Sequence, residues 1–123
     1  MNTVTQFVIK RLKGMVFATR GAWYLLKTEA SIQVQAVIAL IMTGVGFYYE
    51  ISTTEWILQL LTIGLVMGIE GLNSAIEKMA DFVHPEIHPK IGFIKDIAAG
   101  AVFFAALVAV IVGLIIYWPY LAA

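Results

Sequence analysis

Three long apolar stretches limit what this chain can fold into. They cover residues 30–50, 54–82 and 92–117, and each is long enough as a helix to cross the roughly 30 Å hydrocarbon core of a lipid bilayer. The chain has 123 residues, of which 61% are hydrophobic, a share too high for an ordinary soluble domain. The sequence therefore predicts a single all-α membrane domain with three transmembrane helices.

The segment before the first stretch has a different pattern. Within residues 5–28, apolar side chains recur at helical spacing at Val8, Leu12 and Met15. A face about 100° wide carries the basic residues Lys10, Lys13, Arg20 and Lys27. A helix of this kind lies in the membrane surface, with its apolar side in the lipid and its charges in water. We therefore expect an amphipathic interfacial helix over residues 5–28.

Basic residues set the expected orientation in the membrane. All eight fall within residues 10–27 or 78–95, whereas the turn after the first span carries only Glu50 and Glu55 as charged residues. Loops rich in lysine and arginine stay in the cytoplasm, so we expect the N-terminus and the connector before the third span on that side. Three spans then leave the C-terminus outside.

A polar stripe at the end of the second span is the strongest sign of function. Its members fall within about 100° of one helical face, although the rest of the segment is apolar. A carboxylate in a bilayer costs roughly 2.5–3.5 kcal/mol on insertion scales, so it needs a metal ion, a basic partner or water. We expect a functional site here; the alternative is that these groups only join helices or reach the headgroups. The stripe consists of Glu70, Asn73, Ser74, Glu77 and Asp81.

Two acids of the stripe lie at different depths. Glu70 follows Trp56, which we expect at the outer interface, by 14 residues or about 21 Å of helix, so it lies inside the hydrocarbon core. Glu77 lies about 10 Å further along, near the cytoplasmic boundary. One acid is placed to meet a group at lipid depth, and the other to meet a ligand that arrives from water.

The predicted topology brings residues of the other spans to the same layer. Glu29 precedes the first span, and Lys95 and Asp96 lie in the first turns of the third. Carboxylate and amide oxygens together with a lysine suit Mg²⁺ and a nucleotide polyphosphate. The chain has no GxxxxGKS/T loop, no GxGxxG and no HRD or DFG motif, which excludes the P-loop and protein-kinase folds, and it has no cysteine for a thiolate site.

Three further features have a structural as well as a functional interpretation. The connector from His84 to Lys90 contains two prolines, which predicts a loop with exposed histidines more readily than a metal site. Phe17 falls among the cations of the first helix, where it would stack on a nucleotide base or dip into the headgroups. Gly64 and Gly68 form a small-xxx-small pair that is typical of helix packing.

Local signals predict where the second and third spans begin and end. Thr53 or Thr54 is the expected N-cap of the second helix. The third helix should begin near Gly92, after the prolines of the connector. The aromatic and proline residues that should mark its outer end are Trp118, Pro119 and Tyr120.

Three motifs together carry a resemblance to a known family. They are Glu29 after the amphipathic segment, the run ExLNSAIExxxD over residues 70–81, and the run KDIAAGAV over residues 95–102. The chain resembles, over nearly its whole length, the prokaryotic integral-membrane diacylglycerol kinase family, which includes undecaprenol kinases. The resemblance implies a homotrimer in the bacterial inner membrane, with active sites shared between neighbouring protomers. It implies no nucleic-acid partner.

The resemblance also implies an ATP- and Mg²⁺-dependent lipid kinase with roles for individual residues. Glu29 and Glu77 would hold the Mg²⁺ that accompanies ATP. Glu70 would act as a base toward the lipid hydroxyl, supported by Asn73. Further nucleotide contacts would come from Lys95, Asp96, Lys10 and Phe17. The chain departs from the pattern of other members, in ways that affect details of the nucleotide and lipid contacts, at Ala18, Gln33 and Ala99.

The lipid substrate and two rival functions stay open. The connector and the AAGAV run favour undecaprenol slightly over diacylglycerol, while the apolar spans do not distinguish the two. A small oligomeric channel or transporter would line its path with Glu70 and Glu77, although no acid continues toward the outer face. A non-catalytic assembly subunit would leave Glu29, Lys95 and Asp96 without a role.

Overall fold

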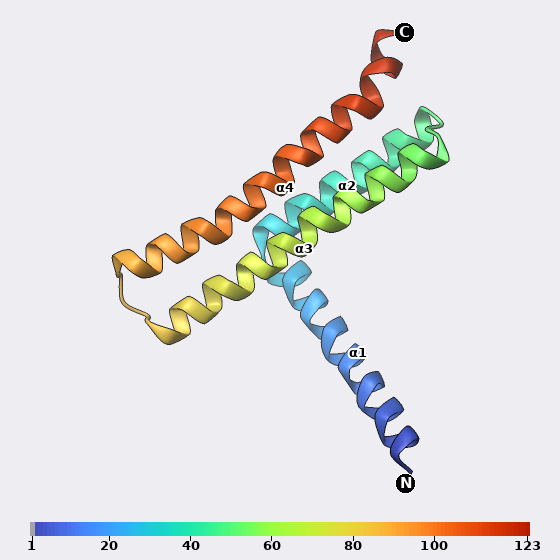
Figure 1. Cartoon of the computed structure of the whole chain (residues 1–123). Helices are drawn as coiled ribbons and strands as arrows, with labels where there is room; N and C mark the ends of the chain where they lie inside the picture. The colour runs from blue at the N-terminus through green and yellow to red at the C-terminus, as the bar shows by residue number, and fades with distance from the viewer. Residues whose placement is uncertain (1) are drawn as a thin grey trace.

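The chain folds into four helices, of which three form a bundle and one points away from it (Figure 1). This computed structural model describes residues 2–123. Helix α3 packs along both α2 and α4, and α1 contacts α2. Three helices are long and apolar enough to cross a membrane, which confirms the all-helical architecture with three candidate spans. The helices are α1 (Thr3–Thr28), α2 (Ala30–Tyr48), α3 (Thr53–Val83) and α4 (Pro89–Ala122).

A single residue joins α1 to α2. Glu29 has an extended backbone (φ −95°, ψ 114°), so the two helices meet at an angle (Figure 1). The side chain of Gln33, in the first turns of α2, donates from Nε2 to the carbonyl oxygens of Leu26 and Lys27, both at 3.1 Å. These carbonyls lie at the end of α1, where a helix lacks its own donors. The first turns of α2 therefore fix the direction in which α1 leaves.

The N-cap of α3 lies one residue before Thr53 and two before Thr54, the two predicted positions. Ser52 is the N-cap, and Thr53 is already helical, so the expectation of Thr53 or Thr54 was wrong. The Glu55 backbone N–H donates to Ser52 Oγ at 3.2 Å, and the Ser52 N–H donates to Glu55 Oε1 at 3.0 Å. This capping box requires an acid three residues after the cap, and only Ser52 has one.

The end of the bundle where α2 meets α3, here named the turn end, is packed by aromatic and aliphatic side chains. Ile51, Ile116 and Tyr117 are buried there. The Trp56 ring passes directly over Gly46, where an added Cβ would lie 2.7 Å from a ring carbon. The close approach of α2 and α3 at this end therefore requires a glycine.

The end where α3 meets α4, here named the connector end, has a loop of five residues after Val83. Helix α4 begins at Pro89 and not near Gly92, because His88 is its N-cap and accepts from the Lys90 N–H through Nδ1 at 3.1 Å. Proline suits the first helical turn, where no N–H partner is needed. At its other end α4 continues through Pro119 to Ala122, beyond the predicted limit at residue 117. The helix accommodates this proline because the backbone hydrogen bond that it removes lies in the last turns.

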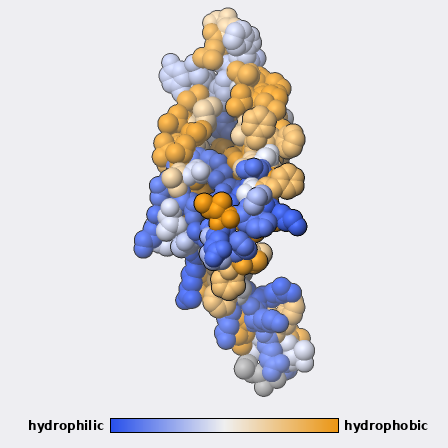
Figure 2. All heavy atoms as spheres, turned by 90° about the vertical axis from the view of Figure 1, so that its left-hand side faces the viewer, coloured by the Kyte–Doolittle hydropathy of each residue, from blue (hydrophilic) through white to orange (hydrophobic). Residues whose placement is uncertain are grey.

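The surface of the single chain separates by polarity. Figure 2 shows hydrophilic residues gathered around the connector end and along α1, with hydrophobic residues on the flanks of the bundle above them. Most large apolar side chains of the candidate spans are exposed in one chain. Gly64 and Gly68 have no atom of another helix within 4 Å of an added Cβ, so no close helix packing depends on them within the described chain.

Candidate functional site

Three polar residues of the α3 stripe are buried near the connector end. The residue exposure is 7% for Glu70, 8% for Asn73 and 4% for Ser74. Charged and amide side chains are buried rarely, and then usually with partners that satisfy them. The stripe that the sequence singled out is therefore directed into the protein at these three positions.

Asn73 has one satisfied and one unsatisfied polar atom. Its Nδ2 donates to Glu77 Oε1, one turn further along α3, at 3.3 Å. Its Oδ1 is buried and has no hydrogen-bond partner among residues 2–123. A buried oxygen without a partner costs about 1–3 kcal/mol. This oxygen is the clearest vacant acceptor in the stripe, and it stands one turn from Glu70.

Glu29 reaches the same part of α3 from the junction of α1 and α2. Its Oε1 forms an ion pair with Lys78 Nζ at 3.1 Å, and the side chains are 24% and 52% exposed respectively. The Lys78 ammonium also lies 5.3 Å from the centre of the Tyr24 ring on α1. Lys78 directly follows Glu77, so this ion pair brings Glu29 to the helical turn that carries Glu77. Lys78 was not among the predicted site residues, although it is the only lysine or arginine between Lys27 and Lys90.

Lys95 pairs with the last member of the polar stripe. Its Nζ lies 2.6 Å from Asp81 Oδ1, so the first turns of α4 and the last turns of α3 are joined by an ion pair. Asp96 is exposed on the next position of α4. Lys95 and Asp96 thus lie at the connector end, beside the end of the stripe.

Lys10 and Phe17 lie apart from this layer within one chain. Both are exposed on α1, which points away from the bundle (Figure 1), and the Phe17 ring has the Arg20 guanidinium carbon 5.7 Å from its centre. The angle at Glu29 separates the N-terminal half of α1 from the stripe of the same chain. A single chain therefore brings Glu29 to α3 but not Lys10 or Phe17.

The available metal ligands are oxygen atoms. Residues 2–123 contain no group of three or more His, Cys, Asp or Glu side chains arranged to hold a metal. The carboxylates of Glu29 and Glu77 and the vacant Oδ1 of Asn73 are hard donors, which fit Mg²⁺ in chemical type. The two connector histidines instead use Nδ1 in the loop itself, His84 toward the Glu86 carbonyl and His88 toward Lys90.

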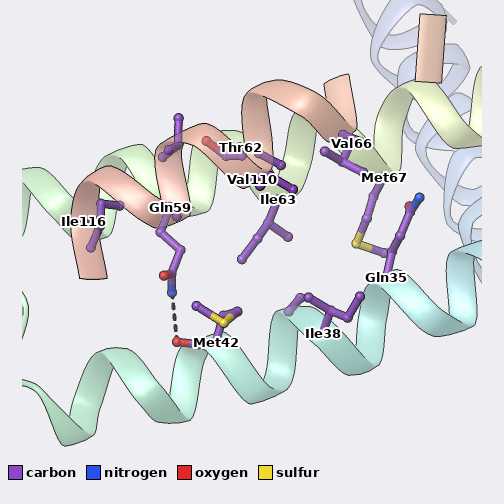
Figure 3. Close-up of a pocket in the computed structure, with 15 residues that line it drawn as sticks. Gln35, Ile38, Met42, Gln59, Thr62, Ile63, Val66, Met67, Val110 and Ile116 are labelled. Carbon is purple, nitrogen blue, oxygen red and sulfur yellow. Dashed lines mark hydrogen bonds between the residues drawn. The ribbon is translucent and has the colours of Figure 1, made fainter. Parts of the chain in front are cut away.

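An apolar cavity of about 500 Å³ lies between α2, α3 and α4 (Figure 3). Its lining includes two amides: Gln59, which donates to the Met42 carbonyl at 3.0 Å, and Gln35, whose Oε1 is buried without a partner among residues 2–123. The rest of the lining is mainly aliphatic, with Ile38, Ile63 and Val66 among its members. Sequence analysis missed this cavity because three helices form it together, and no single segment carries its pattern.

Comparison with known proteins identifies the family. Residues 16–117 match the family model of prokaryotic diacylglycerol kinase. The chain is 39% identical over 109 residues to the undecaprenol kinase of Bacillus subtilis, which covers 89% of each chain. It is 33% identical over 101 residues to the diacylglycerol kinase of Escherichia coli K12, covering 82% of this chain and 80% of the relative. The diacylglycerol kinase of Haemophilus influenzae is 30% identical over 89 residues, or 72% of this chain and 75% of that one.

The matched region contains α2 and α3 whole, and all of α1 and α4 except the start of α1 and the last turn of α4. It includes the buried stripe of α3, the Glu29 junction and the Lys95 ion pair. A membrane kinase of lipids, with three apolar helices and a polar layer at one end, accounts for these features together. The chain belongs to the prokaryotic diacylglycerol kinase family.

Proposed function

We propose that this protein transfers the γ-phosphate of ATP to the hydroxyl group of a membrane lipid, with Mg²⁺ as cofactor. Membership of the family supports lipid phosphorylation with ATP as the donor. The observation that carries the proposal for this chain is the buried pair Glu70 and Asn73, with an Asn73 oxygen that no residue of the described chain satisfies. A substrate hydroxyl that donates to this oxygen, or a metal ion bound to the phosphate, would complete that site.

Glu70 is the base in this proposal. It lies on the buried stripe of α3, about 10 Å of helix from Glu77 and on the side nearer the turn end. A carboxylate at that position, inside the cytoplasmic boundary of the hydrocarbon core, meets a lipid hydroxyl group and accepts its proton as the phosphoryl group is transferred. Asn73, one turn away, holds Glu77 through Nδ2 and offers Oδ1 toward the reacting groups.

Glu29 and Glu77 hold the metal ion in this proposal. Glu29 is brought by its ion pair to the α3 turn that carries Glu77, and the Asn73 amide fixes one Glu77 oxygen. Mg²⁺ bound by these residues would neutralise the charge of the transferred phosphate. Phosphoryl transfer depends mainly on positioning and charge neutralisation, which a small site of this kind can supply.

The nucleotide contacts need residues that one chain keeps apart. Lys95 and Asp96 lie at the connector end, whereas Lys10 and Phe17 lie on the distant part of α1. A homotrimer in the inner membrane, with the N-terminus in the cytoplasm and the C-terminus outside, would allow α1 of one protomer to approach another protomer's site. The large exposed apolar surface of the single chain supports such an assembly, although lipid covers part of it.

Undecaprenol is the slightly preferred lipid, with diacylglycerol as the alternative. The undecaprenol kinase of Bacillus subtilis is 39% identical to this chain, and the diacylglycerol kinase of Escherichia coli K12 is 33% identical. The apolar cavity between the three helices suits a hydrocarbon tail of either lipid (Figure 3). The cavity therefore supports a lipid substrate without selecting between the two lipids.

The test is transfer of ³²P from MgATP to undecaprenol and to diacylglycerol, presented side by side in detergent micelles. We expect labelled lipid from the wild type, and a loss of about 10²- to 10⁴-fold in Glu70→Gln, since a positioned base contributes that much. Glu55→Gln is the matched control, because Glu55 lies at the other end of α3, where its carboxylate hydrogen-bonds to Ser52 and Tyr120. Folded wild type that labels neither alcohol, or Glu70→Gln that keeps full activity, would contradict the proposal.

A further inference from the structure

Lys78 occupies a position that the chemistry of the proposed site does not use. Its ammonium lies 3.1 Å from Glu29 Oε1 and 5.3 Å from the centre of the Tyr24 ring. It therefore links α3 with the end of α1 and with the junction residue. A charged lysine cannot act as a metal ligand. Lys78 nevertheless directly follows Glu77 in the sequence.

The ion pair engages a carboxylate that the proposed function assigns to the metal. A carboxylate oxygen that accepts from an ammonium is already neutralised and partly blocked as a ligand. The Lys78 side chain is 52% exposed, so water screens this pair and keeps it weak. A divalent cation shared by two carboxylates gains more from the same site than one ammonium does. The pair is therefore weak enough to be exchanged for a metal ion.

We propose that Lys78 competes with the divalent cation for Glu29: its ammonium occupies the Glu29 carboxylate while no metal is bound and is displaced from it when the cation binds. This inference rests on the proposed metal role of Glu29 and Glu77. The ring of Tyr24 gives the displaced ammonium a second partner close by, since an aromatic face attracts a cation. Lys78 thus lowers the affinity of the site for the cation.

Competition and tethering predict opposite changes in metal affinity. If Lys78 competes with the cation, its removal frees Glu29 and tightens binding. If Lys78 only fastens α1 and the junction to α3, its removal loosens Glu29 and weakens binding. The sign of the change therefore decides between these two roles, without any measurement of lipid phosphorylation.

The experiment is a titration of the full-length protein in detergent with Mn²⁺, without nucleotide or lipid substrate, in which electron paramagnetic resonance measures free Mn²⁺. We expect Lys78→Met to lower the Kd about two- to fivefold, the change that corresponds to loss of an exposed ion pair. Lys78→Arg keeps the charge and should restore the wild-type Kd. Lys90→Met removes the same charge from the connector, away from Glu29, and should leave the Kd unchanged.

Glu29→Gln separates failure of this inference from failure of the proposed function. If wild type binds Mn²⁺ and Glu29→Gln does not, while Lys78→Met binds no more tightly than wild type, the role of Lys78 is wrong and the metal site stands. If no binding depends on Glu29, the proposed metal assignment fails, and the role of Lys78 fails with it. When Glu29→Gln is already present, adding Lys78→Met should leave the Kd for Mn²⁺ unchanged.

Discussion

Helix α3 carries a buried amide side chain toward each of its ends, Gln59 at the turn end and Asn73 at the connector end. Gln59 uses both of its polar atoms: Nε2 donates to the Met42 carbonyl at 3.0 Å, and Oε1 accepts from the Tyr117 hydroxyl. Asn73 uses only Nδ2, and its Oδ1 remains without a partner in the described chain. The two amides are chemically alike, but only one of them is complete within the protein.

The same contrast extends to the acids at the two ends. Glu55 at the turn end accepts from the Ser52 N–H and from the Tyr120 hydroxyl at 2.7 Å. Glu70 at the connector end is buried, and it lies one turn along α3 from Asn73, whose Oδ1 has no partner in the described chain. Polar groups that satisfy one another stabilise the fold, whereas polar groups kept unsatisfied lower stability and are usually retained for a ligand. The polar groups of the turn end therefore stabilise the bundle, whereas those of the connector end leave an acceptor unsatisfied, which supports the proposed site there.

Among tests of this difference between the two ends, Asn73→Leu should have the largest effect, which is a loss of activity. We expect lipid phosphorylation to fall about 10- to 100-fold, the usual cost of losing a group that orients a metal ligand. The midpoint of thermal unfolding should not fall, because the substitution removes a buried unsatisfied oxygen. The check is ³²P transfer together with thermal unfolding in detergent. An Asn73→Leu protein that unfolds early and keeps its activity would place Asn73 with the structural groups.

Gln59→Leu should give the opposite result. It leaves the buried Tyr117 hydroxyl without its Gln59 partner, so we expect the free energy of unfolding to fall by about 1–3 kcal/mol. Activity per folded molecule should stay near wild type at temperatures well below unfolding. Thermal unfolding and ³²P transfer, measured on the same preparation, test both parts. Lost activity with unchanged stability would break the comparison between the two ends.

The smallest expected effect concerns the start of α3. Ser52→Ala removes the side-chain acceptor of the capping box and should lower the free energy of unfolding by about 1 kcal/mol. Thr53→Ala is the matched control, since Thr53 is inside the helix and should leave stability nearly unchanged. Equal losses in both variants, measured by chemical or thermal unfolding, would show that Ser52 has no special role as the cap.

Long-range periodicity predicted the helices, and local chemistry decided their ends. The apolar stretches are long enough to require spanning helices whatever their detailed sequence. The start of α3 is predictable from Glu55, since the pattern Ser52-x-x-Glu55 is a capping-box signal visible in the sequence. The start of α4 at Pro89 follows in the same way from the preference of proline for the first helical turn.

The sequence predicted which residues of the candidate site lie in one layer, but not the contacts that join them across helices. Helical angle alone grouped Glu70, Asn73 and Glu77, and two of these are buried as the stripe implies. The ion pair between Lys78 and Glu29 depends on the angle at a junction of one residue, which no local pattern determines. The apolar cavity likewise depends on how three helices pack. Contacts between elements therefore had to come from the structure.

The junction at Glu29 also restricts how this chain can vary in length. A residue inserted in the last turn of α1, just before Glu29, would turn the rest of α1 by about 100° about its axis and shift it by about 1.5 Å. The carbonyls of Leu26 and Lys27 would then leave the reach of the Gln33 amide, and Glu29 would no longer face Lys78 as it does now. Loops elsewhere in proteins tolerate insertions readily. At this position the spacing between the first two helices is as strictly constrained as the identity of the residues.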